Sequence, residues 1–172
     1  MISLIVGGIS IPPEAALDLT QSYEPEQGAA LLRMMNGNLK KQTQWQGKLA
    51  TRIAGGGWIP IGLQALDYAA TMTLACIAPR AIDAAGTSIV LPAARRADAG
   101  CTPRGFAIGA DGRQVETSIG IATNTATLGA VAGALGYRVL YWPLLTVFAE
   151  PPTASVDARR AAYSWELNAK EA

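Results

Sequence analysis

The chain has 172 residues, of which half are apolar and 16% are charged, and its formal net charge is +1. This length suits one ordinary domain with a real core, and the near-zero charge excludes a global field that would attract nucleic acid or an anionic membrane. There is no histidine, which removes the commonest general base and metal ligand and the Ser-His and Cys-His nucleophile systems. The charged fraction lies below the usual value of about 25%, so we expect partners to cover part of the surface.

The N-terminal residues predict a short hairpin. Two β-rich runs between Ile2 and Ile11 flank Gly7-Gly8, which is typical of a two-residue turn. A helical turn is expected from Glu14 to Leu19 and a polar link from Thr20 to Gln27. The segment lacks a basic n-region, so we expect no signal peptide and synthesis in the cytoplasm.

The stretch from Gln27 to Pro79 predicts the core of an antiparallel sheet. Ala29 to Met35 forms a strand, Asn36-Gly37 a turn, and Leu39 to Ala54 a long strand with one wet face. The three glycines Gly55 to Gly57 are expected to let another backbone approach closely. Together with the residues up to Pro60 they would form a corner, after which Ala70 to Ala78 alternates as a strand.

Residues 81–136 are the least patterned part, and we expect them to form an insertion or an extended loop or arm. Ala81 to Arg104 indicates one short strand and an exposed loop. An Asp111-Gly112 turn predicts a hairpin. Ala122 to Gly136 is expected to be a loop, or a short helix from about Leu128.

The C-terminal part carries the strongest β signals. Aromatic and β-branched residues dominate Tyr137 to Ala149, and Pro143 implies an edge, a bulge or a bend. A last strand is expected from Ala162 to Asn168. We therefore predict one mainly β domain over residues 1–172, an antiparallel sandwich or barrel with at most one or two short helices.

Two segments resemble functional elements, a phosphate-binding loop and a membrane span, but their composition disfavours both interpretations. Gly55 to Gly57 lacks the Lys-Ser or Lys-Thr and the helix start of a phosphate-binding loop. Leu128 to Phe148 has the length of a membrane span. However, Arg138 lies at its midpoint and Gly136 and Pro143 break the helical pattern, so a buried strand after a loop is favoured.

The charged residues and cysteines single out no catalytic, metal or cofactor site. Lysines and Arg52 around Trp45 could form a nucleic-acid surface, but a solvated strand face is favoured. Four acids fall in turns without a pairing pattern, namely Asp67, Asp111, Glu116 and Glu150. Cys76 and Cys101 could pair, although reduced buried thiols are favoured for a chain without an export signal.

Two runs of the sequence resemble tail and baseplate proteins of long-tailed bacteriophages. The first is GAALLRMMNGNLKKQTQW…KLATRIAGGGWIPIGLQALD…TLACIAP, and the second is YWPLLTVFAEPPTASVDARRAAYSWELNAKEA. The second run has a strand, a Pro-rich bend and a last strand of the form Tyr-x-Trp-x-Leu, and it is similar to distal tail proteins. The resemblance covers about residues 1–80 and the last 35 residues, and not residues 81–136.

The resemblance implies a non-enzymatic virion protein that forms a ring at the tail tip, with a hexamer among the expected forms. Such rings join the tail tube to hub and fibre proteins. The alternative is a carbohydrate- or receptor-binding β-sandwich. Neither reading requires nucleic acid or a membrane span. We expect the following residues to contact partners: Trp45, Trp58, Arg95, Arg96, Leu128, Val131 and Trp142. The tryptophans among them could equally lie in the core.

Overall fold

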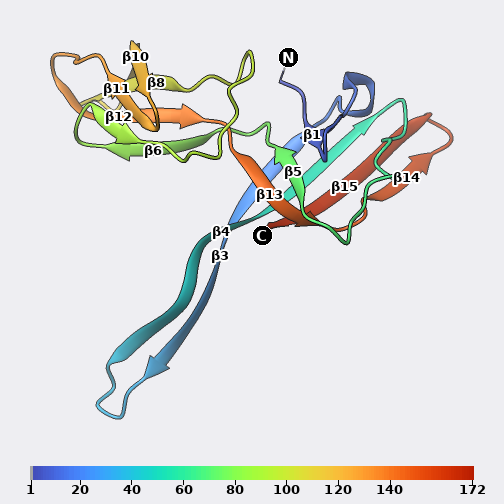
Figure 1. Ribbon diagram of the computed structural model, residues 1–172, viewed down its shortest axis with the longest axis horizontal. Coiled ribbons are helices and arrows are strands. Elements are labelled where there is room, and N and C mark those ends of the chain that lie inside the picture. The colour runs from blue at the N-terminus through green and yellow to red at the C-terminus, as the bar shows by residue number, and fades with distance from the viewer. Residues whose placement is uncertain (1) are drawn as a thin grey trace. The chain divides into compact units, whose positions relative to one another are not determined.

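The computed structural model describes residues 2–172 and confirms a mainly β, antiparallel fold (Figure 1). In that range the only helical element is one 3-10 turn, η1 (Pro13–Ala15). The strands are β1 (Ile5–Val6), β2 (Ile9–Ser10), β3 (Thr20–Arg33), β4 (Leu39–Gly57), β5 (Met72–Ala75), β6 (Arg80–Ala84), β7 (Ser88–Val90), β8 (Arg104–Gly109), β9 (Gln114–Thr117), β10 (Ile119–Ala122), β11 (Thr125–Leu128), β12 (Ala134–Tyr141), β13 (Leu144–Ala149), β14 (Thr153–Asp157) and β15 (Ala162–Glu171).

The chain divides into two compact units. The sandwich unit comprises residues 2–5 with Leu74–Leu145, and the sheet unit comprises Val6–Thr73 with Thr146–Ala172. Residues 81–136, expected as an insertion or arm, fall within the sandwich unit. They contain seven strands or parts of strands, because short strands with weak alternation can still pair when both neighbours are supplied by distant segments.

The sandwich unit is built from two small sheets. One has the order β10-β11-β7 and the other β6-β12-β8-β9. Side chains from both sheets form a single buried cluster, with Ile89 and Ala126 from the first sheet and Ala107 and Val139 from the second. The loop or short helix expected over Ala122 to Gly136 is wrong, because this segment contains strand β11 and a turn. The strand is held in place by Ala126 and Leu128, which are buried in the cluster.

The large sheet has the order β2-β1-β5-β13-β15-β4-β3, and β14 also pairs with β15. Strands β1, β5 and β13 contain the points where the chain passes between units. In the sheet unit β15 pairs with β4 from Ala50 to Gly57. Along β4 and β15 one face is buried, with Ile53 and Leu167 fully enclosed, and the other is exposed. The alternation predicted for both strands is confirmed.

Strand β3 begins earlier than predicted. The expected polar link from Thr20 to Gln27 is its first half, paired with β4. Pro25 signals a break in the sequence, but β3 is the outermost strand of its sheet. A proline is tolerated there because its missing N–H need not serve a neighbour.

Glycines at the end of β4 allow the segment around η1 to lie directly against the strand. The Trp58 amide donates to the Glu14 carbonyl at 2.8 Å, and a Cβ on Gly57 would lie 1.9 Å from the same oxygen. The Trp165 indole Nε1 donates to the Ala15 carbonyl at 2.7 Å and occupies the space left by Gly55. Close backbone approach at these glycines is therefore confirmed. The corner predicted there is wrong, because Gly55 to Gly57 continue β4 and pair with β15.

Candidate functional site

The most unusual surface of the sheet unit is the far end of its longest hairpin. We call residues 27–47 the arm (Figure 1). Strand β15 pairs with β4 only from Ala50 onward, so within the described residues the arm consists of β3 and β4 alone. Every residue from 29 to 48 is exposed. Both edges of this ribbon present unpaired backbone groups, which are templates for pairing with another chain.

The tip of the arm is a tight, well-defined turn. The Met34 amide donates to the Asn38 carbonyl, and the Gly37 amide donates to the Met34 carbonyl, both at 2.9 Å. Gly37 has a φ of 82°, which a glycine adopts without a steric penalty. The Asn36-Gly37 turn predicted from the sequence is confirmed, and it leaves Met35 fully exposed at the end of the ribbon.

Two β-bulges mark the base of the arm. The register with β4 shifts between Glu26 and Gly28 and again between Gly28 and Ala29. Gly47, on the bulged strand, has a φ of 88°. Because bulges bend a strand and increase its twist, they separate the arm from the part of β4 that is held by β15.

The arm exposes large apolar side chains on both faces. Cross-strand partners share a face, so Leu31 with Lys41 lies on one side and Leu32 with Lys40 on the other. A two-stranded ribbon is at best marginally stable alone in water, and soluble monomers rarely expose contiguous apolar patches of this kind. The exposed large apolar residues of the arm are Leu31, Leu32, Met34, Met35, Leu39 and Trp45.

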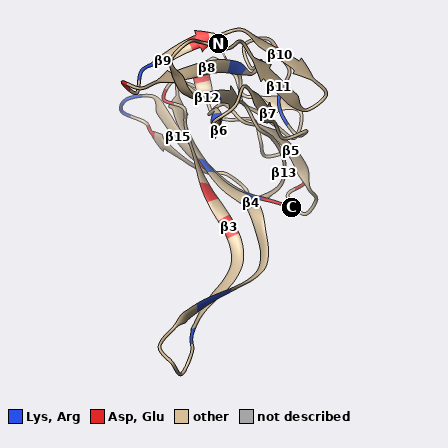
Figure 2. Cartoon of the chain, turned by 90° about the vertical axis from the view of Figure 1, so that its left-hand side faces the viewer, with Lys and Arg blue, Asp and Glu red and all other residues tan. Residues whose placement is uncertain are grey.

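The arm is also purely basic. Its only charged residues are Arg33, Lys40 and Lys41. Figure 2 shows blue segments on the distal ribbon and red segments at the base of β3. Arg33 donates to the Gly37 carbonyl and Lys41 to the Gln27 side chain, so none of the three has an acidic partner among residues 2–172.

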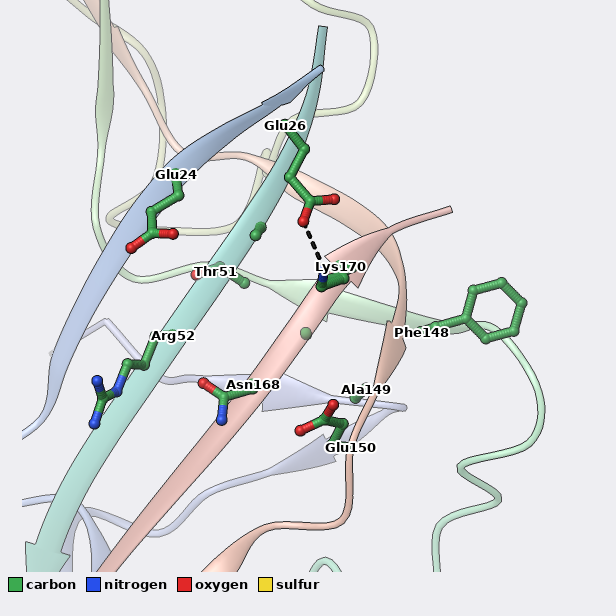
Figure 3. Close-up of a pocket in the computed structure, with 11 residues that line it drawn as sticks. Glu24, Glu26, Thr51, Arg52, Phe148, Ala149, Glu150, Asn168 and Lys170 are labelled. Carbon is green, nitrogen blue, oxygen red and sulfur yellow. Dashed lines mark ion pairs between the residues drawn. The ribbon is translucent and has the colours of Figure 1, made fainter. Parts of the chain in front are cut away.

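A second feature of the sheet unit is an open groove of about 510 Å³ on the exposed face of the sheet. We call it the acidic groove. Its polar side chains come from β3, β4 and β15 and from Glu150, which directly follows β13. Figure 3 shows Phe148 at one end, with its ring directed away from the carboxylates. Its outward-facing lining residues are Glu24, Glu26, Ala50, Arg52, Phe148, Glu150, Asn168 and Lys170.

The cations of the acidic groove are already paired. Lys170 Nζ lies 2.7 Å from Glu26 Oε1, and Arg52 Nη2 lies 2.5 Å from Glu166 Oε2. The hydrogen bond that Lys170 donates to Glu26 raises the pKa of Lys170, and the hydrogen bond that Glu166 accepts from Arg52 lowers the pKa of Glu166. Within residues 2–172, Glu24 and Glu150 have no ion-pair partner. The charge of Glu150 also contributes to raising the pKa of Lys170. The groove therefore has a surplus of negative charge.

Only some of the residues expected to contact partners are available on the surface. Trp45 is 47% exposed in the arm and Trp58 is 68% exposed just after β4. Arg95 is half-buried in the sandwich unit, where its guanidinium donates to the Thr123 carbonyl and the Asn124 side chain.

The other expected contact residues serve the core of the sandwich unit. Leu128 is buried in the hydrophobic cluster and Val131 packs against it. Trp142 is buried and donates to the Ile77 carbonyl at 2.9 Å. Arg96 is 3% exposed, with its donors bound to carbonyls and to Asp98. In the sandwich unit these side chains serve internal packing. The prediction that Arg96, Leu128 and Trp142 contact partners is therefore wrong, because all three are buried.

Residues 2–172 contain no cluster of three Cys, Asp or Glu side chains arranged to hold a metal ion. Glu116 is held by Arg104 at 2.9 Å, and Asp111 lies beside Arg113. Cys76 and Cys101 are both buried and are not joined in a disulfide. The arrangement on the surface is thus suited to association through apolar contact and charge.

Comparisons with protein-family models, with curated proteins and with solved structures return no match. Among the described residues, no helix is long and apolar enough to cross a membrane.

Proposed function

We propose that the protein is a structural, non-catalytic subunit that assembles with copies of itself, and that it forms a ring at the tip of a bacteriophage tail. The observation that carries the proposal is the arm. It is a two-stranded ribbon with unpaired edges, six exposed large apolar side chains and no acid. Burial of such a ribbon against another subunit would remove the apolar surface from water and satisfy the free edges.

The geometry favours a head-to-tail arrangement. The arm lies at one end of a strand whose other half is fixed in a sheet, so it would cover a different part of another copy, and such a contact can repeat from subunit to subunit. A head-to-tail contact closes into a ring when the rotation per subunit divides a full turn. The placement at a phage tail tip is supported by the resemblance of the first 80 and last 35 residues to distal tail proteins, whose neighbours are the tail tube, the hub and the fibres.

Deletion of the arm tests the assembly role. Glu26 and Lys48 face each other across the ribbon, so residues 27–47 can be replaced by Asn-Gly, the preferred two-residue hairpin turn. We expect the full chain to form closed rings by negative-stain electron microscopy and a defined oligomer by light scattering. The shortened chain should be monomeric with an unchanged β circular dichroism spectrum. A full chain that remains monomeric up to its solubility limit would overturn the proposal.

The placement in the virion needs its own measurement. An antibody against the chain, applied to purified tails of the phage that encodes it, is expected to label the distal end of the tail tube. Labelling along the whole tube, or no labelling of intact tails, would contradict a tail-tip ring while leaving self-assembly untouched.

The exposed tryptophans favour a second candidate function, a carbohydrate- or receptor-binding surface. Trp45 and Trp58 are both exposed, and aromatic faces are common anchors for ligands. Trp45 lies within β4 and Trp58 just after its end, about 40 Å of extended chain apart, so the two indoles do not form one platform. A glycan array probed with the wild type and with Trp58→Ala would test the remaining single-tryptophan site, and binding lost in the variant would support it.

A further inference from the structure

We infer that the arm of one copy docks in the acidic groove of a second copy. The inference rests on the proposed function, since it names the surface that the arm would bind. The two features belong to the same chain and are complementary: the arm carries Arg33, Lys40 and Lys41 without an acid, and the groove has a surplus of acid, with Glu24 and Glu150 in no ion pair.

The apolar parts of the two surfaces also match. Leu31 faces the same side as Lys41, and Leu32 the same side as Lys40, so either face of the ribbon presents an aliphatic chain beside an ammonium group. In the groove, the half-exposed phenyl ring of Phe148 lies two residues from Glu150. An aliphatic side chain could therefore cover Phe148 while the neighbouring lysine reaches a carboxylate. Apolar burial would provide affinity, and charge would select the orientation.

The contact must be intermolecular. Glu24 and Glu26 stand on β3 just before the arm, and the strand continues to Arg33 without interruption. Ten extended residues separate Glu26 from Asn36, which places the tip about 30 Å from the groove of its own chain. Folding the arm back would break the β3–β4 ladder. Each copy therefore gives one arm to another copy and receives one. We take the copy that receives an arm to differ from the copy that gives one, because this head-to-tail contact can close into the proposed ring.

Charge reversal tests the docking without altering the core, because all four targets are exposed. The arm variant is Lys40→Glu with Lys41→Glu, and the groove variant is Glu24→Lys with Glu150→Lys. We expect each variant alone to associate at least about tenfold more weakly than the wild type in sedimentation equilibrium, since like charges would face each other. The combined four-site variant should regain association, and added salt should weaken the wild-type contact.

Mixing the two variants tests the head-to-tail geometry. The arm variant keeps an intact groove, and the groove variant keeps an intact arm. An equimolar mixture should grow beyond one-to-one dimers with the two variants alternating, because the wild-type arm fits the wild-type groove and the reversed arm fits the reversed groove. A reciprocal exchange of arms across a two-fold axis would instead stop at one-to-one dimers. Two pairs of reversals elsewhere serve as controls: Arg159→Glu with Arg160→Glu in the β14–β15 turn, and Glu14→Lys with Asp18→Lys. We expect both to associate like the wild type.

The outcomes separate this inference from the proposed function. If arm deletion abolishes assembly while the groove variant assembles as the wild type does, the arm binds another surface and the docking inference is wrong, although self-assembly stands. If the wild type remains monomeric and instead sediments with phosphatidylglycerol vesicles in an arm-dependent way, the arm is a membrane anchor and both proposals fall.

Discussion

The indole of Trp45 lies across the ribbon from Gly28 and occupies the space that a side chain would need. The two residues are cross-strand partners between the two bulges, and a Cβ on Gly28 would lie 2.4 Å from the indole Nε1. An aromatic ring that covers a strand glycine shields the exposed backbone and helps to fix the register. The pair thus stabilises the point where the arm leaves the sheet.

Gly28→Ala is expected to displace the Trp45 indole. The ring is half-exposed and can rotate, so we expect a loss of stability below about 1 kcal/mol. The ¹⁵N-indole NMR spectrum should show one of the four tryptophan signals shifted, and Trp45→Phe identifies that signal. Gly120→Ala is the matched strand control, since its Cβ would meet only the Thr127 carbonyl at an ordinary 3.9 Å. An unshifted Trp45 signal in Gly28→Ala would show that the ring does not cover the glycine.

Gly57→Ala should be much more damaging than Gly28→Ala. Its Cβ would lie 1.9 Å from the Glu14 carbonyl oxygen and 2.8 Å from the Ala15 Cα, and backbone cannot move aside as an exposed side chain can. We expect a loss of about 3 kcal/mol or more in the free energy of unfolding, measured by urea denaturation. Gly62→Ala, with open space around the new Cβ, should be close to neutral. Equal effects of the two substitutions would contradict the close approach of η1 to β4.

The sequence predicts most strands of the sheet unit because their periodicity and turn residues act locally. The Asn36-Gly37 turn, the alternation of β15 and the interruption between β12 and β13 at Pro143 all follow from local chemistry. The arm could not be recognised in this way, because its residues form a regular hairpin whether or not a third strand lies beside them. What makes the hairpin an arm is that β15 ends its pairing with β4 at Ala50, and the register of distant strands is not visible in a local pattern.

The same limit explains the misassigned contact residues. A charged side chain such as Arg96 normally marks the surface, and a run such as Ala122 to Gly136 lacks strong β-formers. In the structure, segments distant in the sequence supply hydrogen-bond acceptors to Arg96 and pairing strands to the Ala122 to Gly136 run. Arg96 finds backbone carbonyls from two other segments, and β11 pairs with both β10 and β7. Two signals in the sequence did bear on the arm: the absence of acids between residues 27 and 47 and the low overall charge.

Arg96→Met is expected to destabilise the sandwich unit strongly. The side chain is 1% exposed, and its Nη1 donates to the carbonyls of Ser3, Ala75 and Cys76 at 2.8 to 3.2 Å. Removal leaves these acceptors without their donor, for which we expect a loss of about 3 kcal/mol or more in urea denaturation. Arg104→Met removes an equally bidentate arginine from Glu116, but both side chains are half-exposed. Its effect should be much smaller, and equal losses would contradict the role assigned to burial.

Burial should also protect both thiols from modification. Cys76 and Cys101 are fully enclosed, and burial raises the pKa of the Cys101 thiol. A buried thiol of raised pKa presents little thiolate to an electrophile. We expect neither cysteine to react with Ellman's reagent in the folded protein at pH 8, and both to react in guanidinium chloride. Rapid reaction of one thiol in the native protein would show that the segment around it opens readily.

The ion pair between Asp98 and Arg96 predicts how stability responds to acid. Arg96 Nε and Nη2 donate to the two carboxylate oxygens at 2.9 and 2.6 Å, and this hydrogen bonding lowers the pKa of Asp98. A carboxyl group whose pKa is lower in the folded state stabilises the fold above its unfolded pKa of about 3.9. This contribution is lost as the pH falls through the lowered folded pKa. The carboxylate is 52% exposed, so solvent screening should limit the contribution to about 1 kcal/mol.

Asp98→Asn isolates this contribution from the other acids of the protein. Near pH 7 we expect the variant to be less stable than the wild type by about that amount. The difference between the two free energies of unfolding should stay constant down to about pH 5, decrease below about pH 4, and vanish in strong acid, where Asp98 is protonated in both folded and unfolded wild type. Urea denaturation at a series of pH values measures it. A difference that does not depend on pH would mean that the carboxylate acts through its shape and hydrogen bonds, and that its charge contributes nothing.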